Sequence, residues 1–335
     1  MNPIWKDYFV EFHDKEVISY RIYCEDDLVY SGKAYRRPGE MSVSVKLNEV
    51  CADYMLNVLP DMQSEFTGIG YPEFKVYNEE EKTGEWVLAH QVQFTNDWSF
   101  DYDFNPAKEG LAFPINGRVS PNQWIIYSDY KPAAITAVLR FKDGKTLTYN
   151  VKIGIAGDFN MDFNSDFARV VNANMSGTAV FKPDLTNVDT ITIGNRVYKV
   201  ADNCSRYVLY YCNAHGGWDS LLVEGNHAEV DEVTRYTREL SYDNRNVQNR
   251  GRVNYANEIT KRMTLHSSWL LGDESSRMHH LLNATEVYLY DTQTDKMIPV
   301  LLTNSETEYK TYKGNGGQLV NYAIEVEFAN RRVRR

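Results

Sequence analysis

Cysteine is scarce in this chain of 335 residues, which has only four. So few thiols cannot form the disulfide framework that holds small secreted domains together. We therefore expect reduced, mostly packed side chains at Cys24, Cys51, Cys204 and Cys212. Cys204 and Cys212 lie eight positions apart with no histidine at a ligand spacing. A zinc site is not expected there, because tetrahedral zinc needs four closely spaced ligands.

Long hydrophobic runs are also missing, and no window approaches the ~18 consecutive apolar residues of a membrane-spanning helix. We therefore expect no membrane insertion. The first twelve residues lack a basic segment followed by an apolar run, so they do not resemble a secretory signal, and we expect assembly in a cytoplasm. The net charge of −10 argues against binding to nucleic acid or anionic membranes. With 43% hydrophobic and 24% charged residues, the chain has the composition of a folded protein with full-sized cores.

Catalytic motifs are absent as well: there is no nucleophile elbow, zinc-protease motif, phosphate loop or dinucleotide fingerprint. His279 and His280 are adjacent on a predicted helix, where their side chains point about 100° apart and cannot share a metal as an i, i+4 pair does. The other histidines have no serine, cysteine or aspartate at a recognisable catalytic spacing: His13, His90, His215, His227 and His266. We therefore expect no enzyme activity, no metal and no cofactor.

One acidic segment, residues 158–166, superficially matches a calcium loop. Oxygen-bearing side chains occur there at every second position: Asp158, Asn160, Asp162, Asn164 and Asp166. The match fails at the sixth position, where Phe163 replaces the glycine of the sharp turn, and at the twelfth, where Arg169 replaces a bidentate glutamate. The alternation favours the solvated face of a strand, and calcium binding is the alternative.

A second acidic run contains Asp97, Asp101 and Asp103, and could supply the two carboxylates of a glycosidase. Aromatic residues alternate with these acids. A sheet with an exposed acidic face produces the same pattern without any substrate, so we favour that interpretation.

Aromatic residues make up 13% of the chain, and short runs of alternating polarity are frequent, which predicts a mainly β protein. The Asp143-Gly144 pair predicts a tight hairpin turn at residues 142–145. Two helices are predicted, at residues 49–59 and at about 273–282, the second with Met278, Leu281 and Leu282 toward the core. Strands are predicted at residues 17–23, 28–34, 41–47, 86–94, 124–127, 135–141, 147–153, 179–182, 196–200, 207–212, 220–224, 259–265, 287–290, 297–303, 306–312 and 319–328. We expect consecutive β-sandwich-like domains at residues 1–118, 119–202 and 203–335.

The C-terminus carries four cations in five residues: Arg331, Arg332, Arg334 and Arg335. They form either a solvated tail or candidate subunit contacts with an acidic surface of a neighbouring copy, such as residues 101–103 or 79–81. Opposite charges segregated on one chain favour head-to-tail contacts in rings.

The C-terminal series RYVLYYCNAHGGWDSLLVEG (206–225), KRMTLHSSWLLGDESSRMHHLL (261–282) and the strands of 287–313 resembles tail structural proteins of phages and prophages of Bacteroidetes. LVYSGKAYRRPG, LNEVCADYM, AFPINGRV and QWIIY are similar to the same group. The order of strands and helix resembles the sandwich-plus-helix module of distal tail and tail-tube proteins. The long N-terminal region favours a distal tail or baseplate component over a simple tube protein.

This resemblance implies a virion protein that forms a homo-oligomeric ring and links the tail tube to baseplate or receptor-binding proteins. It implies no catalytic residues. One alternative is a carbohydrate- or receptor-binding module of the tail tip, in which an exposed tryptophan stacks on a sugar: Trp86, Trp98, Trp124, Trp218 or Trp269. A β-sandwich glycosidase is the less favoured alternative.

Overall fold

The computed structural model describes residues 2–3, 7–24, 26–57, 73–80, 82–95, 117–121, 123–128, 134–152, 178–181, 185–194, 196–201, 205–240, 251–267, 269–270, 272–304, 320–330 and 332–334. In these residues the protein is mainly β, with several antiparallel sheets and two short helices, which confirms the predicted class. The chain divides into two compact units. The first comprises Met1–Pro114, Trp124–Val200 and Cys212–Asp219, and the second Ile115–Gln123, Ala201–Tyr211 and Ser220–Arg335. The predicted division at residues 118 and 202 stays a prediction.

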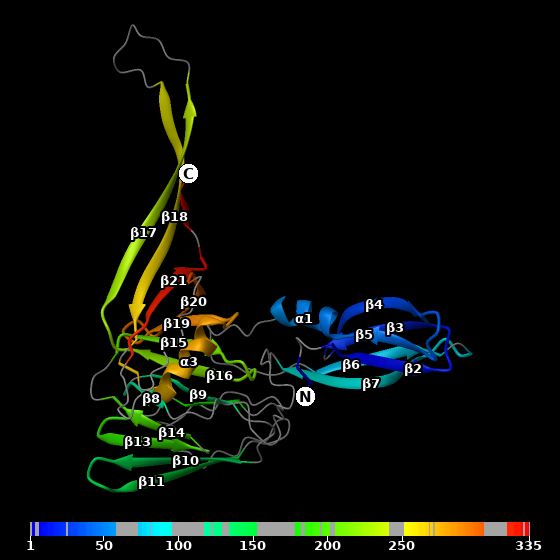
Figure 1. Ribbon diagram of the computed structural model, residues 1–335, viewed down its shortest axis with the longest axis horizontal. Coiled ribbons are helices and arrows are strands. Elements are labelled where there is room, and N and C mark those ends of the chain that lie inside the picture. The colour runs from blue at the N-terminus through cyan, green and yellow to red at the C-terminus, as the bar shows by residue number, and fades with distance from the viewer. Residues whose placement is uncertain are drawn as a thin grey trace. The chain divides into compact units, whose positions relative to one another are not determined.

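The N-terminal part of the first unit contains one five-stranded sheet, one strand pair and a helix over a shared core (Figure 1). Burial alternates along β3, so that Ile18, Tyr20 and Ile22 face this core and meet Val45 and Phe74. The elements are β1 (Asn2–Pro3), β2 (Phe9–His13), β3 (Val17–Cys24), β4 (Asp27–Tyr35), β5 (Ser42–Lys46), α1 (Asn48–Asn57), β6 (Glu73–Glu79) and β7 (Trp86–Thr95). The sheet order is β1-β7-β6-β3-β4, and β2 pairs with β5.

The remaining strands of the first unit form a second sheet and a strand pair. They are β9 (Ile125–Ser128), β10 (Ala134–Phe141), β11 (Thr146–Lys152), β12 (Thr178–Phe181), β13 (Val188–Ile193) and β14 (Arg196–Val200), of which β11-β10-β13-β14 are successive neighbours and β12 pairs with β9. The predicted hairpin at residues 142–145 is confirmed, because Gly144 has a φ of 86° and Phe141 N donates to Lys145 O at 2.9 Å. Asp143 Oδ1 accepts from Lys145 N at 3.0 Å and closes the turn.

The second unit contains one large antiparallel sheet and the helix α3 (Gly272–Leu282). The strands of the large sheet are β15 (Tyr207–Cys212), β16 (Trp218–Val223), β17 (His227–Glu239), β18 (Arg252–His266), β19 (Val287–Asp291), β20 (Lys296–Leu302), β21 (Ala323–Phe328) and β22 (Arg332–Arg334). The short strand β8 (Gly117–Val119) also lies in this unit but is not part of the large sheet. The order of the large sheet is β16-β15-β19-β20-β21-β18-β17, and β22 pairs with β18. As predicted, Met278 and Leu281 of α3 are buried in the core beside Leu209, Leu265 and Ile324. Burying these apolar side chains holds the helix on one face of the sheet.

Strands β17 and β18 form a hairpin that we call the arm. They have 13 and 15 residues, longer than most strands in globular proteins. Toward the core, β18 pairs with β21 over Arg262–His266, and farther out with β22 over Asn257–Ile259. Beyond Asn257, the described part of β18 pairs only with β17. The arm therefore extends past the other strands of its sheet, as Figure 1 shows.

Gly225, between β16 and β17, allows a close backbone approach in the second unit. A Cβ atom at this position would lie 2.7 Å from His266 Cβ and 2.9 Å from His266 O, and the Gly225 amide donates to that carbonyl. We expect Gly225→Ala to reduce the free energy of unfolding by about 1–3 kcal/mol, because the backbone must shift. Gly32→Ala is the control: its contact is the ring of Tyr30, an exposed side chain that can rotate away. Urea unfolding curves in which both variants lose the same stability would contradict this.

Candidate functional site

Several residues that the sequence singled out lie outside the described residues. They are Asp97, Asp101, Asp103, segment 158–166, Trp98, Cys204, Arg331 and Arg335. The interpretations of both acidic segments therefore stay predictions. Cys24, Cys51 and Cys212 are buried free thiols, which confirms the prediction for these three. Burial, reinforced by Cys24, raises the pKa of the Cys51 thiol to about 12, so this thiol is protonated at neutral pH.

Two of the four C-terminal arginines, Arg332 and Arg334, belong to a strand of the large sheet. The backbone of Arg332–Arg334 forms β22, antiparallel to Asn257–Ile259 of β18. Whether these cations contact a neighbouring copy stays a prediction. The pairing places the backbone of this segment beside the arm.

The tryptophans that were candidates for sugar stacking differ in exposure. Trp218 is only 3% exposed and packs in the interior. Trp86 is half-buried, with the Arg21 guanidinium 4.0 Å from its ring centroid, and Trp124 is also half-buried. Trp269, between β18 and α3, is 61% exposed. Among the described tryptophans, Trp269 therefore offers the most ring surface to a ligand.

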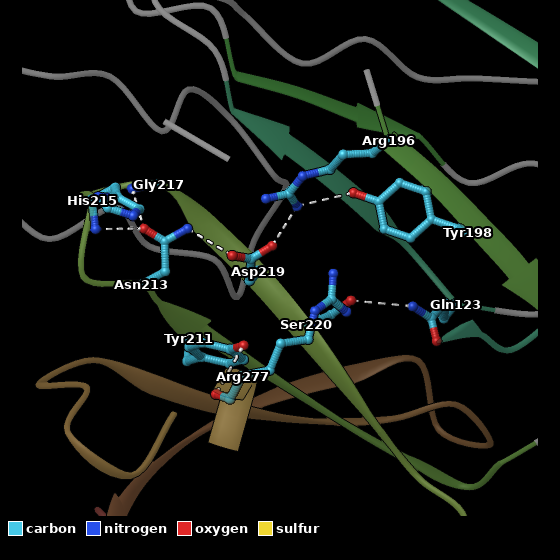
Figure 2. A network of polar contacts seen from close by, with 10 residues as sticks. All are labelled: Gln123, Arg196, Tyr198, Tyr211, Asn213, His215, Gly217, Asp219, Ser220 and Arg277. Atoms are coloured by element: carbon cyan, nitrogen blue, oxygen red, sulfur yellow. Dashed lines mark hydrogen bonds and ion pairs between the residues drawn. The ribbon is translucent and has the colours of Figure 1, made fainter. Parts of the chain in front are cut away.

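A buried polar network joins β14 to the turn between β15 and β16 (Figure 2). Arg196 Nη1 donates to Asp219 Oδ1 at 2.6 Å and to the Tyr198 hydroxyl at 3.3 Å. Asn213 Nδ2 donates to the second carboxylate oxygen of Asp219 at 2.6 Å. Asn213 Oδ1 in turn accepts from the amides of His215 and Gly217, at 2.9 and 3.1 Å. One carboxylate thus fixes both a strand and a tight turn.

This network stabilises the fold. Arg196 and Asp219 are 1% and 2% exposed, so a substrate cannot reach them. Burial alone would lower the pKa of Arg196, but the Asp219 carboxylate and the Tyr198 hydroxyl outweigh that effect and raise the pKa. Arg196 stays charged at every physiological pH, and its role is to position the turn rather than to exchange protons.

The second unit also contains a pocket with a volume of about 550 Å³. Its wall includes Arg118 and Glu224, which form an ion pair at 2.8 Å. Arg206 Cζ lies 4.9 Å from the centroid of the Tyr207 ring, and Arg206 Nη2 lies 3.5 Å from Asp291 Oδ2. The lining residues are Arg118, Ser205, Arg206, Tyr207, Val223, Glu224, Gly225, His227, Ser267, Trp269 and Asn321. Its volume lies within the range of small-ligand sites, and most of its lining residues are polar.

The arm forms a different kind of surface, because β17 is exposed on both faces, whereas β18 is mostly half-buried and is buried at Met263 and Leu265. All residues of β17 are exposed except Val233, which is half-buried. Ion pairs across the hairpin, Glu229–Lys261 at 2.6 Å and Glu232–Arg262 at 3.0 Å, hold its register. Large apolar side chains are nevertheless exposed along it: Val230, Tyr236, Leu240 and Tyr255. Such residues on an exposed edge favour contact with another protein.

Comparisons with protein families, with curated proteins and with solved structures find no match. Within the described residues, no three potential metal ligands cluster together. No helix in that part of the chain has the length and apolar character needed to cross a bilayer.

The sequence reasoning missed the arm. In this region it predicted a strand only at residues 259–265, whereas β18 begins at Arg252 and β17 covers His227–Glu239. A strand exposed on both faces, such as β17, has no need for the alternating polarity that predicts a half-buried strand. The content of Val, Thr and Tyr in both strands was the available signal.

Proposed function

We propose that this protein is a structural component of a phage tail, a distal tail or baseplate ring protein that links the tail tube to the adsorption apparatus. The second unit, a sheet covered by one helix, would be the tail-tube-like module. The N-terminal part of the first unit would add contacts outside the ring. The arm is the observation that carries this proposal. The segments that resemble phage tail proteins provide independent support.

The physical argument starts from the poor stability of an isolated two-stranded ribbon in water. The outer part of the arm has no second layer among the described residues, and the outer edge of β17 has no paired strand there. Unpaired backbone groups on a long edge are a template for another chain. If the partner is the same surface of the next copy, repeated head-to-tail contacts close a ring.

The arm also offers the side chains that such a contact uses. The rings of Tyr236 and Tyr255 contact each other across the hairpin in a tilted arrangement, with 6.3 Å between their centroids, and the Tyr236 hydroxyl donates to Glu258 Oε2 at 2.8 Å. Tyrosine combines apolar area with a hydrogen-bonding group and is enriched in interface cores. We therefore expect these two rings and Val230 to be buried in the assembly.

Oligomer mass is the decisive measurement. We expect mass photometry of the full chain to show one defined ring-sized species, about six copies or a multiple of six. Val230→Lys should shift the population toward monomer at least tenfold, because it places a charge in the arm contact. Val87→Lys is the matched control, since Val87 is similarly exposed on β7.

A chain that stays monomeric at every concentration and salt condition would reject the ring. Antibody labelling of virions then tests the position: label at the tail tip agrees with the proposal, and label confined to the capsid rejects it.

A further inference from the structure

We infer that the pocket of the second unit binds a neutral oligosaccharide, with Trp269 as the stacking platform and Arg118, Glu224 and Asn321 as its hydrogen-bonding groups. All of these residues line the same pocket. His227, the first residue of β17, lines this pocket at the base of the arm, whereas Val230, Tyr236 and Tyr255 do not, and the inference does not require that the ring forms.

Trp269 has an exposed ring on a firmly held backbone. The next residue, Leu270, exchanges two backbone hydrogen bonds with Val320, at 2.8 and 2.9 Å, and its side chain is buried in the core. The backbone that carries the ring is therefore held in place, which reduces the entropy lost when a ligand binds. The face of a pyranose ring carries several C–H groups, and it packs well against a flat, rigid aromatic surface such as indole.

The polar side chains of the pocket can form hydrogen bonds with the hydroxyl groups of a sugar. Glu224 can accept hydrogen bonds from a sugar, whereas Arg118 donates them, and the amide of Asn321 does both. Arg118 and Glu224 hold each other at 2.8 Å while both side chains keep part of their surface exposed. Neighbouring hydroxyls on a pyranose both donate and accept, so they can bridge such a pair without separating it.

Charge balance selects a neutral ligand over a phosphate. Both arginines in the wall have a carboxylate beside them: Arg118 has Glu224, and Arg206 has Asp291 at 3.5 Å. A strongly anionic ligand would compete with these carboxylates and be repelled by them. The exposed ring of Trp269 provides the aromatic part of the recognition, whereas Tyr207 in the pocket wall is only 4% exposed.

The test is binding of the full chain to an array of immobilised neutral and acidic oligosaccharides, followed by calorimetric titration of the best-bound neutral one. We expect binding that Trp269→Ala weakens at least tenfold, whereas Trp269→Phe keeps a substantial part of it because an aromatic face remains. Glu224→Gln should weaken binding severalfold through the lost carboxylate acceptor. Trp86→Ala is the matched control on the first unit and should bind like the native chain.

Failure to bind any neutral oligosaccharide would overturn the inference, and so would equal binding by Trp269→Ala. Preference for acidic glycans or inorganic phosphate would overturn the charge argument. Because Trp269 is exposed, its replacement should leave the melting temperature unchanged, so that lost binding cannot be attributed to unfolding. Mass photometry on the same samples separates this outcome from failure of the ring.

Discussion

Asp219→Asn is expected to destabilise the first unit by about 3–5 kcal/mol, because it leaves the buried Arg196 cation without its counter-charge. The carboxylate lies 2.6 Å from the guanidinium, and both side chains are almost completely inaccessible to water. Backbone amides of the turn at residues 213–217, which Asn213 holds through Asp219, should then exchange with solvent at least ~100-fold faster. Hydrogen exchange measured by mass spectrometry reports this directly.

Two further variants separate charge from packing. Replacing both partners, Arg196→Met with Asp219→Asn, removes the unpaired cation and keeps an amide beside Asn213, so we expect most of the lost stability to return. Glu16→Gln changes the exposed pair between Glu16 and Arg36 and should leave exchange unchanged, because water screens it. If Asp219→Asn exchanges like the native chain, the pair does not hold the turn.

The parts of the fold that the sequence predicted well are those whose physical cause is local or repeats along the chain. Residue Gly144 supplies the positive φ that a hairpin turn needs, and the structure forms that turn. Val320, Tyr322, Ile324 and Val326 alternate along the last long strand, and all four are buried in one core. The structure differs from the predicted strand at residues 319–328 only in where regular pairing begins. Strand β21 begins at Ala323, and Val320 forms an isolated bridge to Leu270.

The candidate sites depend instead on contacts between distant segments. Arg196 and Asp219 are 23 positions apart, and nothing in their neighbourhoods distinguishes a buried ion pair from two exposed charges. Trp269 was one of five tryptophan candidates, and exposure singled it out only when the fold was known. Its pocket combines residues from Arg118 to Asn321, a set that no spacing rule connects.

Glu286 should make the second unit less stable as the pH rises through neutrality. This side chain lies between α3 and β19 and is 9% exposed, and burial raises its pKa to about 7 from 4.5. Between these two values the folded state keeps a proton that the unfolded state releases, so stability is full below pH 4.5 and is lost as the pH approaches and passes 7. The shift corresponds to about 3 kcal/mol.

Glu286→Gln removes this titration while keeping the size of the side chain. The free energy of unfolding of the variant minus that of the native chain should therefore increase by about 3 kcal/mol from pH 4.5 to pH 8 and then level off, because glutamine has no charge to bury. Glu325→Gln, at an exposed position of β21, controls for the loss of a carboxylate and should show no such increase. Urea unfolding at several pH values measures both differences. A difference for Glu286→Gln that does not change with pH would mean that Glu286 is ionised in the folded protein, and that its surroundings supply the polar contacts that a buried carboxylate requires.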